Sequence, residues 1–296
     1  MDTIEAVRAV EDVCILGEGP IWDPFRSRVL WVDIRRGMVF SADHRSDGTL
    51  EVRERVEFGE TVGAVAVSPT GDWVVAGATG LFFRSPDGAI TRGPQILPAG
   101  SGRRLNDGKS DPWGRFVVGS LSLDGPSTTE TLVRVGLDSQ ITVLDDDLTL
   151  SNGLAWTASG ARMYSIDTLS RTIFVRSYYP NSGAVGPRRE FLRVDGLPDG
   201  MCLDAEEHLW VAMWGSGEVH RYSPDGHLVS VITVPAPNVS SVAFVGPLLE
   251  TLVITTATQD LTAEQLAEHP ESGRVFTVEP KVLGLPQTAW RGPVLL

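Results

Sequence analysis

Cysteine and long apolar runs are both scarce in this chain of 296 residues. The two cysteines, Cys14 and Cys202, lie alone in the apolar contexts "DVCILG" and "GMCLDA", which is typical of buried free thiols and argues against a disulfide or a cysteine-based metal site. No run of eighteen apolar residues occurs, and no basic stretch followed by an apolar one opens the sequence. We therefore expect a soluble, cytoplasmic protein.

Positively charged residues are also few. The sequence has 25 lysines and arginines against 38 aspartates and glutamates, which gives a formal net charge of −13. Such a charge repels nucleic acid and anionic membrane surfaces. The expected partner is therefore a small neutral molecule or a cation. The sequence leaves the oligomeric state open.

One short apolar segment recurs six times at intervals of 43 to 47 residues. Its copies are centred on Leu30, Trp73, Phe116, Met163, Leu209 and Leu252. A second apolar stretch precedes each copy across a turn, and a third strand-like piece follows it and ends in a hairpin. Repeats of four strands at this spacing are typical of a β-propeller. The sequence thus predicts an all-β fold, a six-bladed β-propeller with four-stranded blades around a central channel, as a single domain over residues 1–296.

Two segments stand outside this pattern. The N-terminal stretch "IEAVRAVEDV" is expected to add a strand to the last blade and close the ring, because an open ring would leave an unpaired edge. Helical periodicity is confined to the short segment "TAEQLAEHP".

Oxygen-bearing residues recur at one position of the repeat, which lies directly before the first glycine of the inner strand in five blades and before Ser241 in the sixth. This position holds Glu18, Val62, Asp107, Asn152, Asp199 and Ser240. Because the first strand of a propeller blade runs along the channel, these positions converge on one mouth of it. Carboxylates gathered there repel one another unless a cation holds them, and oxygen donors suit a hard or borderline divalent ion.

The tripeptide Pro-Asp-Gly occurs three times, and its position decides how each copy is interpreted. Asp87 and Asp225 follow a third strand, so turn propensity explains them. Asp199 lies at the channel mouth, where a turn role and a chemical role are both open. Asp107 likewise either points into the channel or caps its own turn.

Five motifs, in order across nearly the whole chain, resemble the gluconolactonase, regucalcin (senescence marker protein) and luciferin-regenerating enzyme family. They are "LGEGPIWD" with "LWVDI", "RRLNDGKSDPWGRF", "LSNGLAW" with "MYSIDT", "LPDGMCLDAEEHLWVAMWG", and "APNVSSVAF" with "TTA". The chain departs from the family pattern at Val245, where a glycine is usual. The resemblance implies a six-bladed propeller with one divalent ion in its channel.

The resemblance also implies roles for single residues. Glu18, Asn152 and Asp199 match the metal ligands, and Arg104 and Asn106 match the residues that contact substrate. Asp124 falls where many members carry a glutamate that contacts sugar hydroxyls, and it is one methylene shorter. Arg103, the neighbour of Arg104, is expected to face solvent.

The activity implied by the resemblance is metal-dependent hydrolysis of an aldono-1,4- or 1,5-lactone to the aldonic acid. The metal would act as Lewis acid and Asp199 as general base. Oxygen ligands admit calcium, magnesium, manganese, iron(II) or zinc. Two alternatives remain: an organophosphatase-like hydrolase, whose mechanism needs histidines that no inner-strand entry supplies here, and a non-catalytic propeller that binds calcium or a small molecule.

Overall fold

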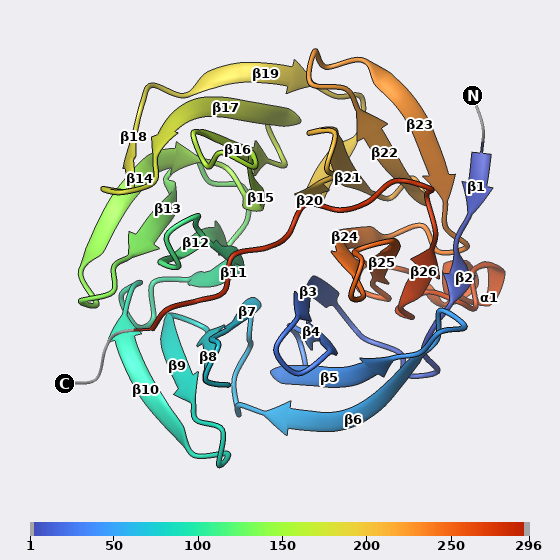
Figure 1. Ribbon diagram of the computed structural model, residues 1–296, viewed down its shortest axis with the longest axis horizontal. Coiled ribbons are helices and arrows are strands. Elements are labelled where there is room, and N and C mark those ends of the chain that lie inside the picture. Colours follow the sequence, from blue (N-terminus) through green and yellow to red (C-terminus); the bar gives the residue numbers. More distant parts are fainter. Residues whose placement is uncertain (1–2, 293–296) are drawn as a thin grey trace.

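The computed structural model describes residues 3–292, which form six small sheets arranged in a ring (Figure 1). The first three blades consist of β3 (Gly17–Asp23), β4 (Arg28–Asp33), β5 (Met38–His44) and β6 (Leu50–Glu57); β7 (Ala64–Val67), β8 (Trp73–Ala76), β9 (Gly80–Arg84) and β10 (Ile90–Gln95); and β11 (Arg103–Ser110), β12 (Phe116–Ser122), β13 (Glu130–Val135) and β14 (Ile141–Leu148). The next two consist of β15 (Ser151–Trp156), β16 (Arg162–Asp167), β17 (Thr172–Tyr179), β18 (Ala184–Val185) and β19 (Arg189–Arg193); and β20 (Leu197–Leu203), β21 (Leu209–Trp214), β22 (Glu218–Tyr222) and β23 (Leu228–Thr233). The sixth contains β24 (Val239–Val245), β25 (Thr251–Thr256) and β26 (Phe276–Val278). The predicted six-bladed β-propeller is confirmed.

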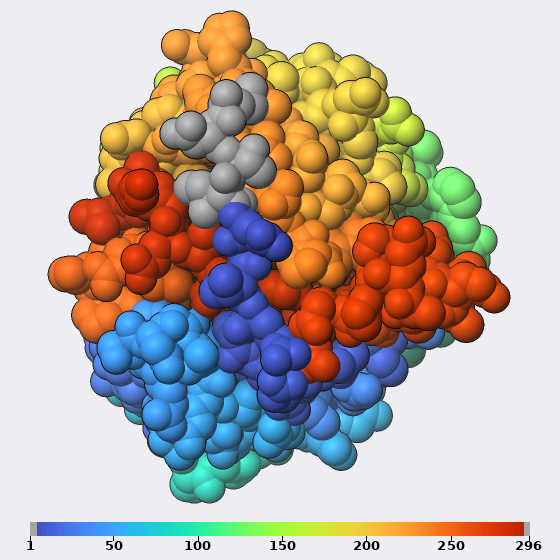
Figure 2. Space-filling view, turned by 90° about the vertical axis from the view of Figure 1, so that its right-hand side faces the viewer, coloured from blue at the N-terminus to red at the C-terminus, as the bar shows by residue number. Residues whose placement is uncertain are grey.

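The N-terminal residues close the ring by joining its last two blades. Val7–Arg8 (β2) pairs antiparallel with β26 as the outermost strand of the sixth blade, which confirms the predicted closure. Thr3–Glu5 (β1) adds a parallel strand beside β23 of the fifth blade, which the sequence did not indicate. Figure 2 shows this blue segment lying between the orange and red surfaces of those blades.

Apolar side chains between neighbouring blades form the core. Trp210 of the fifth blade meets Phe244 of the sixth edge to face, with ring centroids 5.8 Å apart, in one such cluster. Burial of apolar surface contributes about 25 cal/mol per Å². The blades are therefore held in fixed positions around the axis, and so are the side chains at the ends of their inner strands.

Within the described residues, helix is confined to a short segment before β26. The expected helix runs over Ala263–Glu268 (α1), and Thr262 and Gln265 form a capping box at its N-terminus. No helix within residues 3–292 is long and apolar enough to cross a bilayer. Both cysteines are buried free thiols, as predicted, and burial raises the pKa of each to about 12.

The inner strands are interrupted where the polar residues lie. The pairing register shifts after Glu18 in β3, after Leu105 in β11, after Asn152 in β15, after Pro198 in β20 and after Val239 in β24. The inner strand of the second blade, β7, which follows Val62, keeps a continuous register. Because a β-bulge turns a side chain away from the regular alternation, these interruptions direct polar groups toward the channel.

Two glycines let the inner strands approach closely at this level. A Cβ atom on Gly153 would lie 2.6 Å from the Asp199 carbonyl oxygen, and one on Gly200 would lie 2.1 Å from Ser241 Oγ. A larger residue at either position would force neighbouring inner strands apart. The glycines of "SNG" and "PDG" thus serve packing around the axis.

Candidate functional site

A cavity of about 230 Å³ opens where the inner strands begin, and five of the six predicted site residues line it. They are Glu18 from β3, Arg104 and Asn106 from β11, Asn152 from β15 and Asp199 from β20. Each is at most 6% exposed. Four strands from four different blades therefore bring these polar groups to one place.

A larger cavity, of about 490 Å³, lies at the other end of β11, beside Lys109 and residues 285–288. None of the described residues that line it is acidic. Size alone would favour this cavity as the functional site. The buried carboxylates, however, lie at the smaller cavity, and only they can hold a cation or move a proton.

The five buried polar residues named above form what we call the floor of the smaller cavity. A chain of hydrogen bonds across this floor links three blades. Arg104 Nη1 donates to Asn106 Oδ1 at 2.7 Å, and Asn106 Nδ2 donates to Asn152 Oδ1 at 2.8 Å. Asn152 Nδ2 then donates to Thr168 Oγ1 at 2.9 Å, and that hydroxyl donates to the Pro198 carbonyl at 2.8 Å. The chain fixes both asparagine amides and ends next to Asp199.

Three buried carboxyl groups lie close enough to repel one another. Burial raises the pKa of Glu18 well above its usual range, and the charges of Asp199 and Asp107 raise it further. Burial and the charge of Asp107 likewise raise the pKa of Asp199, while Arg104 opposes this rise. The same burial lowers the pKa of Arg104 to about 10.

The carboxylates at the cavity have few hydrogen bonds of their own. Asp199 Oδ1 is buried with no hydrogen-bond partner among residues 3–292. Glu18 Oε2 accepts a long bond of 3.3 Å from the Gly19 amide. A divalent cation fits this arrangement, because it would offset the repulsion and supply the missing partner of Asp199.

Asp107 has the turn-capping role, one of the two roles that the sequence left open. Its Oδ1 accepts a 2.8 Å hydrogen bond from the Gly108 amide, so it caps its own turn. It is also buried, and its charge acts on Glu18 and Asp199, although Asn106 and not Asp107 lines the cavity. The frame of the repeat is shifted by one residue in the third blade, where the bulge follows Leu105.

Asp124 stands apart from the cavity floor. It is exposed and does not line the cavity, and its Oδ2 would lie 1.9 Å from a Cβ atom placed on Gly102. Its carboxylate therefore lies over Gly102. The expectation that Arg103 faces solvent is wrong: its Nε contacts Oε2 of the buried Glu130 at 3.0 Å, because Glu130 needs a cationic partner.

Sequence reasoning missed two buried aspartates that hold the entries of β3 and β15. Asp33 accepts hydrogen bonds from the amides of Ile15 at 2.9 Å and Leu16 at 3.2 Å. Asp167 accepts from the amides of Thr149 at 3.1 Å and Leu150 at 3.0 Å. Both aspartates end the second strand of their blade, in "LWVDI" and "YSIDT". This recurrence in the sequence could have identified them.

Replacing Asp167 by alanine is expected to lower the free energy of unfolding by about 2–3 kcal/mol, since buried amides would lose a charged acceptor. Chemical denaturation of the purified variant measures this change. The exposed-turn variant Asp225→Ala is the matched control and should unfold like the parent protein. Equal stability of the two variants would contradict the role given to Asp167.

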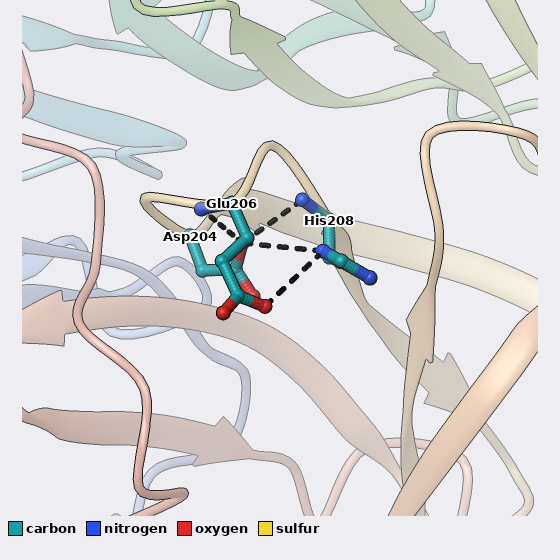
Figure 3. Close-up of side chains that lie close together, drawn as sticks. All are labelled: Asp204, Glu206 and His208. Atoms are coloured by element: carbon teal, nitrogen blue, oxygen red, sulfur yellow. Dashed lines mark hydrogen bonds and ion pairs between the residues drawn. The ribbon is translucent and has the colours of Figure 1, made fainter.

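A second acidic cluster, Asp204, Glu206 and His208, lies at the turn between β20 and β21 (Figure 3). Its possible ligand atoms lie within 4.8 Å of one another. The Asp204 carboxylate, however, accepts from the Glu206 and His208 amides, from Trp210 Nε1 at 3.0 Å and from Arg221 Nη2 at 2.6 Å. These donors saturate it, so the cluster stabilises the turn.

Histidine is absent from the described lining of the smaller cavity. His220 lies in β22 and contacts Glu218 and Tyr222, and His208 belongs to the turn cluster. A mechanism that needs a histidine in this cavity therefore has no residue to carry it. The remaining candidates for proton transfer are its carboxylates.

Comparisons with known proteins show the family of the chain. The model of the SMP-30/gluconolactonase/LRE-like region matches residues 16–258. A pentonolactonase of Haloferax volcanii is 33% identical, covering 86% of this chain and 85% of its own length. A 6-deoxy-6-sulfogluconolactonase of Pseudomonas putida is 32% identical, covering 98% and 99%. The crystal structure of a calcium-binding regucalcin from Agrobacterium tumefaciens superposes with a TM-score of 0.90 at 26% identity, covering 98% and 99%. The chain therefore belongs to the SMP-30/gluconolactonase/LRE-like family.

Proposed function

We propose that this protein hydrolyses a neutral sugar lactone, an aldono-1,4- or 1,5-lactone, to the aldonic acid with the help of one divalent cation. The observation that carries the proposal is the unpartnered Asp199 Oδ1 at the floor of a small cavity that also holds Arg104. The relatives named as lactonases of sugar derivatives support a sugar lactone as the substrate. The negative net charge suits a neutral lactone.

Glu18, Asn152 and Asp199 would hold the cation. They supply two carboxylates and one amide oxygen, a donor set that calcium, magnesium and manganese prefer and that zinc and iron(II) accept. When bound, the cation supplies Lewis-acid polarisation of the lactone carbonyl.

The protein's own residues move the proton and orient the ring. A water oxygen bonds to the lactone carbonyl carbon as one of its protons passes to the Asp199 carboxylate. The bond between that carbon and the ring oxygen then breaks, and the ring oxygen takes the proton from Asp199 to become a hydroxyl, which returns Asp199 to the carboxylate. Arg104 stays charged and donates to the oxygens that gain negative charge. Asn106 holds Arg104 and Asn152 in position.

Removal and return of metal tests the proposal directly. Chelator-stripped protein should release acid from glucono-, galactono-, xylono- or arabinonolactone at the spontaneous rate. Addition of one divalent ion at a time should restore hydrolysis at least about 100-fold, as expected when Lewis-acid stabilisation worth several kcal/mol returns. Acid release in a pH-stat measures both states.

Two outcomes would contradict the proposal. Full activity after the metal is stripped would show that the reaction needs no cation. A flat response to every lactone and ion, with metal still bound tightly by calorimetry, would favour organophosphate substrates or a protein that only binds a cation.

A further inference from the structure

Above its polar floor, the cavity has an apolar wall. Six apolar side chains line it, which we call the collar: Leu16, Leu121, Leu150, Leu169, Leu197 and Trp214. They come from the first, third, fourth and fifth blades, and Trp214 packs against the cluster that contains Leu16. The collar thus lines the same cavity as the polar floor. We call two further polar residues of the lining, Gln259 and the exposed Asp260, the rim.

We propose that the collar selects lactones whose tail lacks a hydroxyl, that is, deoxy-aldonolactones, over their fully hydroxylated counterparts. This inference rests on the proposed function and names the substrate class of the same cavity. It concerns the part of the substrate farthest from the reacting carbonyl.

The floor has few hydrogen-bond donors left for sugar hydroxyls, and its carboxylates, Glu18 and Asp199, would be occupied by the cation. The Asn106 and Asn152 amides are engaged with Arg104, with Thr168 and with each other. The Thr168 hydroxyl already accepts one hydrogen bond and donates another. Arg104 is therefore the main free donor on the floor, and the reacting ester needs it.

The rim offers no ready substitute. Asp124 is exposed and lies over Gly102, outside the described lining of the cavity. At the outer edge, Gln259 Nε2 donates to Asp260 Oδ2 at 3.2 Å, so these two side chains partly satisfy each other.

The chemistry orients the substrate in this cavity. The lactone carbonyl must lie near Asp199 and Arg104, so the carbon chain beyond the ring extends away from the floor and against the collar. A methyl group there buries apolar surface, whereas a hydroxyl loses water without gaining a partner. The preference should therefore be visible between two lactones that differ only in that hydroxyl.

The test uses matched pairs and the metal-loaded protein. L-fucono-1,4-lactone is compared with L-galactono-1,4-lactone, and L-rhamnono-1,4-lactone with L-mannono-1,4-lactone; each pair differs only at the last carbon. We expect kcat/KM to favour the deoxy member of a hydrolysed pair by about tenfold or more, within the range that one unpartnered hydroxyl costs.

A collar variant shows whether these side chains cause the preference. Leu169 is 45% exposed, so Leu169→Asn should fold, and its amide offers a partner to the tail hydroxyl. We expect the preference to shrink about fivefold or more in this variant. Leu248→Asn is the matched control, because Leu248 is 66% exposed and does not line the cavity.

The outcomes separate this inference from the function on which it rests. Hydrolysis with equal or greater kcat/KM for the fully hydroxylated members would overturn the collar's role and leave the lactonase proposal standing. A preference that Leu169→Asn and Leu248→Asn change equally would also overturn it. No hydrolysis of any lactone, in these pairs or in the metal test above, would overturn both.

Discussion

Replacing Asp199 by asparagine is expected to lower the kcat of lactone hydrolysis by at least about 1,000-fold, since general-base catalysis alone contributes about 100- to 10,000-fold. The amide has nearly the same shape, so the packing of β20 should persist. It cannot take a proton from water, and it brings one negative charge fewer to the cation. Acid release at saturating substrate and metal measures the first loss, and calorimetric titration with the metal measures the second.

Stability distinguishes this loss from misfolding. Asp199, Glu18 and Asp107 are buried together, and their raised pKa values mean that the ionised forms cost folding free energy above the ordinary carboxyl pKa. The metal-free Asp199→Asn protein should therefore unfold at the same temperature as the parent or a higher one, at neutral pH. Asp225→Ala, which changes a Pro-Asp-Gly turn far from the cavity, should keep full activity. Turnover near the parent rate in folded Asp199→Asn would refute the assignment of Asp199.

The sequence was sufficient to predict the fold because the repeat itself carries the architecture. Six apolar segments at nearly constant spacing, from Leu30 to Leu252, admit few arrangements other than a ring of equivalent sheets. The extra parallel strand at Thr3–Glu5 could not be foreseen, because three residues contain no period.

The polar floor was predictable for the same reason, with one limit. Equivalent positions in a ring converge, so Glu18, Asn152 and Asp199 could be grouped from their place before a glycine. In the third blade the bulge follows Leu105, and Asn106 lines the cavity in place of Asp107, beside Arg104 from the regular part of the strand. A bulge depends on how two strands pair, so the sequence of one strand does not determine the exact position of the bulge.

Side chains that act through other residues were the hardest to find. Thr168 and Asp167 belong to the end of a second strand and the turn after it, and their importance depends on which amides and hydroxyls fold next to them. The collar leucines are equally hidden, because a leucine at a strand end usually belongs to the core. Both kinds of role become visible only when neighbouring blades are in place.

Arg104→Ala is expected to lower kcat/KM for the preferred lactone about 100-fold, because it removes a charged donor at a buried site, which is worth about 2–3 kcal/mol. Metal affinity should be unchanged or slightly higher. Arg104 is a buried cation that acts on Glu18 and Asp199, so its removal eliminates a repulsion of the bound ion. Steady-state kinetics gives the first quantity and calorimetry the second.

Arg104→Lys sharpens this test. Lysine keeps the charge but lacks the planar fork, so it cannot donate to Asn106 and to the lactone in the same geometry. If the fork matters, the lysine variant should recover only a small part of the lost kcat/KM. If metal affinity falls tenfold or more in both variants, Arg104 acts mainly by holding Asn106 and Asn152 in place, and its assignment as a substrate contact is wrong.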